Sequence, residues 1–184
     1  MMTLPKYPQK QTGFAAIEMT LVTPVFILLI AGAVELTQII QADHIIISIS
    51  REGGNIVSRS STETPQKIMD TIAITAGPLD LSSDGAIYIT SVTGKQNELP
   101  YVSSQYKWNQ AGFNKSSDIW SNCGDWEVDG ACDISQANPP TLNNFSLNLD
   151  DGESVYVVEV FYDYTPLFNL VLDANFTLSD VTYM

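Results

Sequence analysis

The hydrophobic pattern of the chain begins with one unbroken apolar run. From Phe14 to Leu36 there are 23 residues, almost all apolar. As an α-helix they would span about 34 Å, enough to cross the hydrocarbon core of a bilayer. The run carries one carboxylate near its start, Glu18, and a charged side chain inside a membrane usually has a partner. The pattern predicts a transmembrane helix whose acid needs a counter-charge.

After Leu36 the pattern changes from continuous to striped. Apolar residues recur at helical spacing among polar ones, at Leu36, Ile40, Ile47 and Val57. We predict that one helix continues to about Ser58, although Gly53-Gly54 weakens its end. Its first half lies in lipid, and its striped second half packs on a domain. His44 on this segment has no partner motif around it and is expected to be an exposed or packing residue.

A second helix is predicted between two sets of helix-end residues. Thr64 is a suitable N-cap, and Pro65 suits the first helical position. The segment "GP" at Gly77-Pro78 ends the helix. Its expected apolar face consists of Ile68, Met69, Ile72 and Ala73.

Further along the chain the apolar period becomes two, which is typical of strands. The segments "AIYITSV" (86–92), "SVYVVEVFYDY" (154–164) and "NFTLSDVTYM" (175–184) are predicted strands. In the second of these, one face carries Tyr156, Val158, Val160, Tyr162 and Tyr164. Glu159 and Asp163 indicate that the other face is at least partly exposed to water. A long helix followed by several strands predicts an α+β fold in which an antiparallel sheet packs on the helix.

The segment between the first and second predicted strands, residues 94–153, has no clear period. It is rich in Asn, Ser, Gly and Asp and holds all three tryptophans, Trp108, Trp120 and Trp126. A structureless stretch of this length is unusual in a compact domain, so we expect it to contain further strands. The tryptophans form either the small core of this insertion, which we favour, or an exposed binding patch.

Charge is distributed unevenly along the chain. The formal net charge is −13, and the first 13 residues are positive because Lys6 and Lys10 precede every acid. A basic tip, an apolar run and an acidic body form the charge order of an exported chain whose body crosses the membrane. The acidic body argues against nucleic-acid binding, which draws on Lys and Arg.

Cys123 and Cys132 are the only cysteines. In an exported domain they are predicted to form a disulfide across a short loop; the alternative is a pair of free thiols in a cytosolic protein. A single histidine, His44, leaves too few ligands for a zinc site. The segment "DWEVDG" (125–130) approaches a calcium loop but departs from it at Glu127, and Gln136 stands where the last acid is expected. No metal or cofactor is therefore predicted, and a bound calcium is the weaker alternative.

The sequence offers little support for enzyme chemistry. The lone histidine limits triads of the Ser-His-Asp or Cys-His kind, and no glycine-rich phosphate loop is present. A hydrolase that uses a carboxylate pair has no specific pointer in the sequence. We therefore expect a protein that is not an enzyme.

Three interpretations of the N-terminal segment compete. A prepilin signal is cleaved after Gly13, keeps the apolar helix and makes Phe14 the new N-terminus. Its α-amino group then lies one helical turn from Glu18 and provides the missing counter-charge, within the subunit or from a neighbour. A secretory signal peptide would instead be cleaved after Ala33, and a plain anchor would not be cleaved. In the anchor interpretation Glu18 would lie at the membrane surface. We favour the prepilin, because it gives a buried Glu18 its counter-charge.

The same residues resemble a known family. Gly13 followed by "FAAIE", "MTLVTP" with Pro24, and "GAVELTQ" is similar to the TadE-like pseudopilins, minor subunits of the tight-adherence (Flp, type IVb) pilus. "REGGNIVSRS" (51–60) and "VVEVFYDYTPLF" (157–168) resemble two further blocks of that family. These blocks cover about a third of the chain, and residues 80–153 resemble nothing in it.

The resemblance implies a pilin-like architecture, with residues 1–13 as leader, 14–60 as the long helix and 61–184 as the exported domain. It implies cleavage by a prepilin peptidase at Gly13–Phe14, and assembly with other pilin subunits and the pilus machinery. The residues themselves suggest an amine at Phe14 and subunit register at Glu18. Pro24 is either a flexible point that helps the subunit leave the bilayer or a local kink with no role. The protein would sit in the inner membrane with its domain in the periplasm, reach the pilus surface, and act in adhesion and biofilm formation. The alternative is a soluble exported binding module that starts at Val34.

Overall fold

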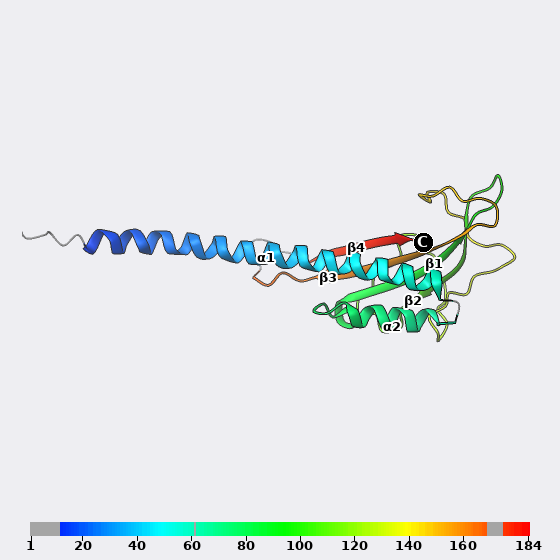
Figure 1. Ribbon diagram of the computed structural model, residues 1–184, viewed down its shortest axis with the longest axis horizontal. Helices are drawn as coiled ribbons and strands as arrows, with labels where there is room; N and C mark the ends of the chain where they lie inside the picture. Colours follow the sequence, from blue (N-terminus) through cyan, green and yellow to red (C-terminus); the bar gives the residue numbers. More distant parts are fainter. Residues whose placement is uncertain (1–11, 61, 169–174) are drawn as a thin grey trace, which may run out of the picture.

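The computed structural model describes residues 12–60, 62–168 and 175–184. Its elements are a long helix, two shorter helices and a four-stranded antiparallel sheet in the order β2-β1-β3-β4. The helices are α1 (Thr12–Arg59), α2 (Pro65–Thr75) and α3 (Leu81–Asp84), and the strands are β1 (Gly85–Thr93), β2 (Tyr101–Lys107), β3 (Ser154–Tyr164) and β4 (Phe176–Tyr183). The second half of α1 packs on the sheet while its first half extends beyond it (Figure 1). The expected α+β class and the helix-on-sheet arrangement are confirmed.

The buried stripe of α1 lies on a different face from the one predicted. Ala42, Ile46 and Ile49 are at most 2% exposed, whereas Leu36 and Ile40 are 58% and 49% exposed. Of the predicted stripe, only Val57 is buried. The prediction was wrong because α1 carries apolar residues on more than one face, so its periodicity alone does not select the face that packs.

Gly53 and Gly54 do not end α1; they let it approach its neighbours closely. A Cβ added to Gly53 would lie 3.0 Å from Ile72 of α2, and one added to Gly54 would lie 2.9 Å from Met184. Larger residues here would push α1 away from α2 and from the end of the chain. The helix continues through both glycines to Arg59, which agrees with the predicted end at about Ser58.

Helix α2 forms as its sequence predicts. The Thr64 hydroxyl accepts a hydrogen bond from the Lys67 amide at 3.4 Å, and Pro65 occupies the first turn. Its buried residues are Ile68, Met69 and Ile72. They join one hydrophobic core with Ile46 and Ile49 of α1 and with Ile87, Ile89, Val158 and Val160 of the sheet. This helix-covered face of the sheet is mainly aliphatic.

The opposite face of the sheet is also covered, by the segment between β2 and β3. Ala86, Tyr88 and Phe161 form one small core there, and Val92, Val102, Leu142 and Val157 form another. Glu159 lies on this face and is 0% exposed. The prediction of a partly wet face at Glu159 was therefore wrong, because the insertion covers it.

The insertion supplies one strand and divides its tryptophans between environments. Strand β2 lies inside the segment that had shown no clear period. Trp108 is buried in the core beneath α2, where its ring nitrogen donates to Asp70 at 2.8 Å. Trp120 packs against the core around Val102, and Trp126 is 37% exposed. The favoured role in the core of the insertion thus holds for Trp120, whereas Trp108 belongs to the main core and Trp126 is on the surface.

Candidate functional site

The first half of α1 has no covering layer among the described residues. Every residue from Ala16 to Ile30 is exposed. Ten large apolar side chains in this stretch are between 41% and 72% exposed. This is the one helix of the described chain that is long and apolar enough to cross a membrane. A solvent-exposed apolar surface of this length requires a lipid or protein environment.

The predicted processing and assembly residues lie at the start of this surface. Gly13 and Phe14 are in the first turn of α1, and Glu18 is exposed four residues beyond Phe14. Four residues correspond to a rise of about 6 Å, a little over one turn. Glu18 makes no ion pair with another described residue. The rest of the expected leader, residues 1–11, lies outside the described residues.

Pro24 lies inside α1, and the helix continues through it. Because proline has no N–H, the carbonyl of Thr20 loses its usual helical hydrogen bond. The hydroxyls of Thr20 and Thr23 donate to the carbonyls of Ala16 and Met19, both at 2.7 Å. The backbone ladder is therefore weaker here than in the rest of the exposed half, while the helix stays continuous.

A second acid of α1, Glu35, was not singled out from the sequence. It is 1% exposed, and neither of its carboxylate oxygens has a hydrogen-bond partner among the described residues. Burial raises the pKa of Tyr164, and the nearby charge of Glu35 adds to that increase. Glu35 marks the position where α1 changes from fully exposed to packed on the sheet. In the sequence, only its place at the end of the apolar run could have pointed to Glu35 as a residue of interest.

Glu159 was predicted to face water but instead anchors the insertion to the sheet. Its carboxylate accepts the Ser117 hydroxyl and the amides of Asp118 and Ile119, the amides at 2.8 and 3.2 Å. Burial raises the pKa of Glu159, although these three hydrogen bonds lower it. On the neighbouring strand, burial and then the charge of Glu159 raise the pKa of Tyr88 to about 12.

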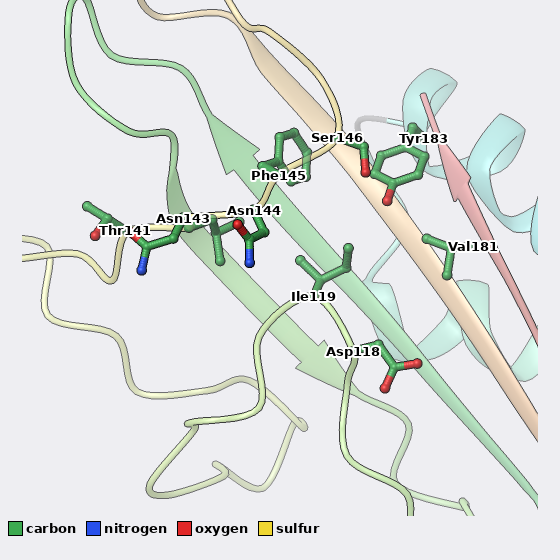
Figure 2. A pocket seen from close by; sticks show the side chains of 10 residues that line it. Asp118, Ile119, Thr141, Asn143, Asn144, Phe145, Ser146, Val181 and Tyr183 are labelled. Atoms are coloured by element: carbon green, nitrogen blue, oxygen red, sulfur yellow. The ribbon is translucent and has the colours of Figure 1, made fainter.

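The segment that Glu159 holds forms one wall of a groove of about 450 Å³. Figure 2 shows Asp118 and Ile119 on this wall, facing Val181 and Tyr183 of β4. The remaining wall comes from residues 141–146, where Phe145 meets the Tyr183 ring edge-on at a centroid distance of 5.8 Å. The groove combines apolar side chains with the amides of Asn143 and Asn144.

The predicted disulfide is present between Cys123 and Cys132, with their Cα atoms 5.9 Å apart. It closes the loop that contains "DWEVDG". In that loop the Asp129 carboxylate accepts the Ala131 amide at 3.0 Å, a local turn contact. Within the described ranges, no group of three or more candidate ligands is close enough to hold a metal ion.

Comparison with known proteins gives one match. The family model described as TadE-like protein matches residues 13–55. No curated protein and no solved structure matches the chain. The matched segment contains Gly13, Phe14, Glu18, Pro24 and Glu35, and it covers most of α1. The block at 157–168 lies outside it.

The match therefore covers the exposed apolar half of α1 and most of the half that packs on the sheet. TadE-like proteins are structural components of pilin type, associated with the tight-adherence system. The remainder of the chain, including the insertion and the groove, lies outside the matched segment. Through its N-terminal helix, residues 13–55, this chain is similar to the TadE-like protein family.

Proposed function

We propose that the chain is a minor pseudopilin of a tight-adherence pilus, made as an inner-membrane prepilin and cleaved after Gly13. In this proposal residues 1–13 are the leader, the first half of residues 14–60 is the anchor, and residues 61–184 form the periplasmic domain. A prepilin peptidase removes the leader, and the subunit then joins other pilins through the assembly machinery. Surface adhesion and biofilm formation follow from its place in the pilus.

The observation that carries the proposal is the exposed apolar half of α1 with Glu18 near its start. In the membrane this helix is surrounded by lipid, and in a filament by the helices of neighbouring subunits. A carboxylate in either place is costly unless a positive charge lies beside it. Cleavage before Phe14 produces an α-amino group one turn away, which can neutralise Glu18 or a neighbour's Glu18.

The role proposed for Pro24 concerns the transfer from membrane to filament. The Thr20 carbonyl lacks its helical partner, so α1 bends more easily at this point than elsewhere in its exposed half. A bend there would let the anchor leave the bilayer while the domain stays folded. Membrane helices tolerate such a proline because neighbouring groups can satisfy the carbonyl.

The proposal is tested by mass spectrometry of the protein from its native host. We expect the N-terminal residue to be Phe14. A product that begins at Val34 would support the released binding module instead, and a product that retains residues 1–13 would contradict processing altogether.

The role of Glu18 is tested by Glu18→Ala, with Glu52→Ala as a matched control on the exposed surface of the packed half of α1. Both variants should insert into the membrane and be processed. We expect Glu18→Ala to reduce incorporation into pili about tenfold, because one uncompensated amine costs at least about 1.4 kcal/mol. Equal incorporation of both variants would exclude the proposed charge pair.

A further inference from the structure

The two edge strands of the sheet, β2 and β4, differ in whether other segments pair with their outward backbone groups. At the β2 edge the insertion supplies backbone hydrogen bonds near both ends of the strand. The Val102 amide donates to Pro140 at 2.9 Å, and the Lys107 amide donates to Gly130 at 2.8 Å. Cys132 donates to Gln105 at 2.8 Å, so the disulfide loop contributes to this cover. The β2 edge is therefore blocked.

The β4 edge lacks such cover among the described residues. Tyr156 and Met184 exchange two backbone hydrogen bonds, of 2.8 and 2.9 Å, which fixes the register with β3. Antiparallel pairing alternates, so the backbone groups of Thr177, Ser179, Val181 and Tyr183 point away from β3. Beyond the sheet ladder, no described residue makes a backbone hydrogen bond with these four.

Natural proteins usually protect an open edge with lysine, proline or a bulge, because an open edge pairs with other strands. Strand β4 contains neither lysine nor proline over its eight residues. Its register with β3 is regular from end to end. Asp180 is its one charged residue. The edge is thus long and regular, and no described residue protects it, while the opposite edge of the same sheet is covered.

The groove lies along the β4 edge. It is on the face of the sheet that carries the side chains of Val181 and Tyr183, two of the residues whose backbone groups point away from β3. Val181 and Tyr183 contribute both free backbone groups and side chains that line the groove (Figure 2). A strand added to β4 would place alternate side chains beside them, next to Phe145 and the Asn143 amide. In recognition by strand addition, backbone pairing supplies affinity and side-chain pockets supply specificity. Both parts are present here.

Charge selects the kind of partner. The chain carries 21 acidic residues against 8 basic ones, so a second copy would meet like charge. Asp118 lines the groove and pairs with Lys115 at 3.1 Å, Asp180 lies on the strand, and neither β4 nor the groove lining contains Lys or Arg. An incoming strand with basic side chains is therefore favoured over a strand from another copy.

We infer that β4 is a docking edge, on which an extended, basic strand of a different protein adds to the sheet and fills the adjacent groove with alternate side chains. The inference does not depend on how the N-terminus is processed. It assigns a function to the domain outside the segment matched by the TadE-like family.

The test uses the full-length protein in detergent micelles and a short peptide of alternating valine and lysine, with alternating valine and glutamate as the control peptide. Amide hydrogen exchange is followed residue by residue. We expect the lysine peptide to slow exchange at Thr177, Ser179, Val181 and Tyr183, and to leave the already paired amides of Leu178 and Thr182 unchanged.

A backbone variant separates strand addition from charge attraction. Ser179→Pro removes an outward donor without removing a bond to β3, and Ser179→Ala changes the same exposed side chain while keeping the donor. Thermal unfolding confirms that each variant is folded. We expect Ser179→Pro to weaken peptide binding about tenfold and Ser179→Ala to leave it within about twofold.

Three outcomes would overturn the inference. The first is no slowing of exchange on β4 at millimolar lysine peptide. The second is equal binding by Ser179→Pro and Ser179→Ala, which would indicate non-specific attraction to the acidic surface. The third is protection of the same amides by raising the protein concentration without peptide, which would show that a second copy occupies the edge.

Discussion

The two faces of the sheet are covered by different means. On the helix-covered face, aliphatic side chains of α1, α2, β1 and β3 form one continuous core. On the insertion-covered face, two smaller cores are joined by polar contacts, with Glu159 accepting three hydrogen bonds from residues 117–119. The first face is stabilised by burial of apolar area, and the second depends on satisfying buried polar groups.

The difference explains how one sheet serves two purposes. On the helix-covered face the second half of α1 packs on the sheet. This packing attaches the domain to the exposed first half of the helix and fixes the position of the helix relative to the sheet. The insertion-covered face builds the groove beside β4, because Glu159 places Asp118 and Ile119 opposite Val181. We therefore expect substitutions on the two faces to have distinct effects.

The largest effect is expected on the helix-covered face. Ile46→Ala removes a completely buried side chain between α1 and the sheet and should lower the free energy of unfolding by about 2–5 kcal/mol. Ile40→Ala is the matched control, because Ile40 lies on the same helix and is 49% exposed. Chemical denaturation in detergent micelles measures both. Equal losses would mean that α1 packs on the sheet through the face predicted from the sequence.

A smaller and more local effect is expected on the insertion-covered face. Glu159→Gln replaces one accepting oxygen by an amide group that faces donors, and should cost about 2 kcal/mol. Hydrogen exchange should accelerate at Asp118 and Ile119 while the α1 core keeps its protection. Asp163→Asn, on the same strand and partly exposed, is the control. Uniform acceleration across both faces would show that the two layers unfold as one unit.

The smallest effect is the pH dependence of the same contact. In the folded protein, burial raises the pKa of Glu159 above its ordinary value of 4.5. The folded state therefore binds the proton more tightly, so the stabilisation from this group is complete below pH 4.5 and is lost as pH rises through the raised pKa. We expect the stability of the wild type relative to Glu159→Gln to fall with rising pH over that window. A relative increase would mean that the three hydrogen bonds outweigh burial.

Local signals in the sequence predicted the elements whose chemistry is local. The cap at Thr64, the period-two run of β3 and the disulfide all follow from neighbouring residues, and all three are present in the structure. A further strand within residues 94–153 was expected, but the position of β2 was missed, because its alternation is weak in "YVSSQYK" and its pairing with β1 includes a register shift. The groove could not be predicted from the sequence either, since its walls come from three segments distant in sequence.

Buried acids show most clearly where sequence reasoning stops. Glu159 stands in an alternating strand, where a carboxylate normally indicates a wet face. It is buried because a distant segment covers it and supplies donors from Ser117, Asp118 and Ile119. Glu35 is buried because α1 turns that face toward the domain. In both cases the environment of the acid is set by residues that are not its neighbours in the chain.

By itself, the sequence determined that a long apolar helix precedes an α+β domain, that the helix carries an acid near its start, and that the two cysteines pair. These properties depend on composition and period, which are written along the chain. Only the tertiary structure decided which face of α1 is buried, which side of the sheet the insertion covers and which sheet edge stays open. These features depend on contacts between distant segments. A helix with apolar residues on several faces can bury any of those faces, and packing on the sheet decides which one is buried.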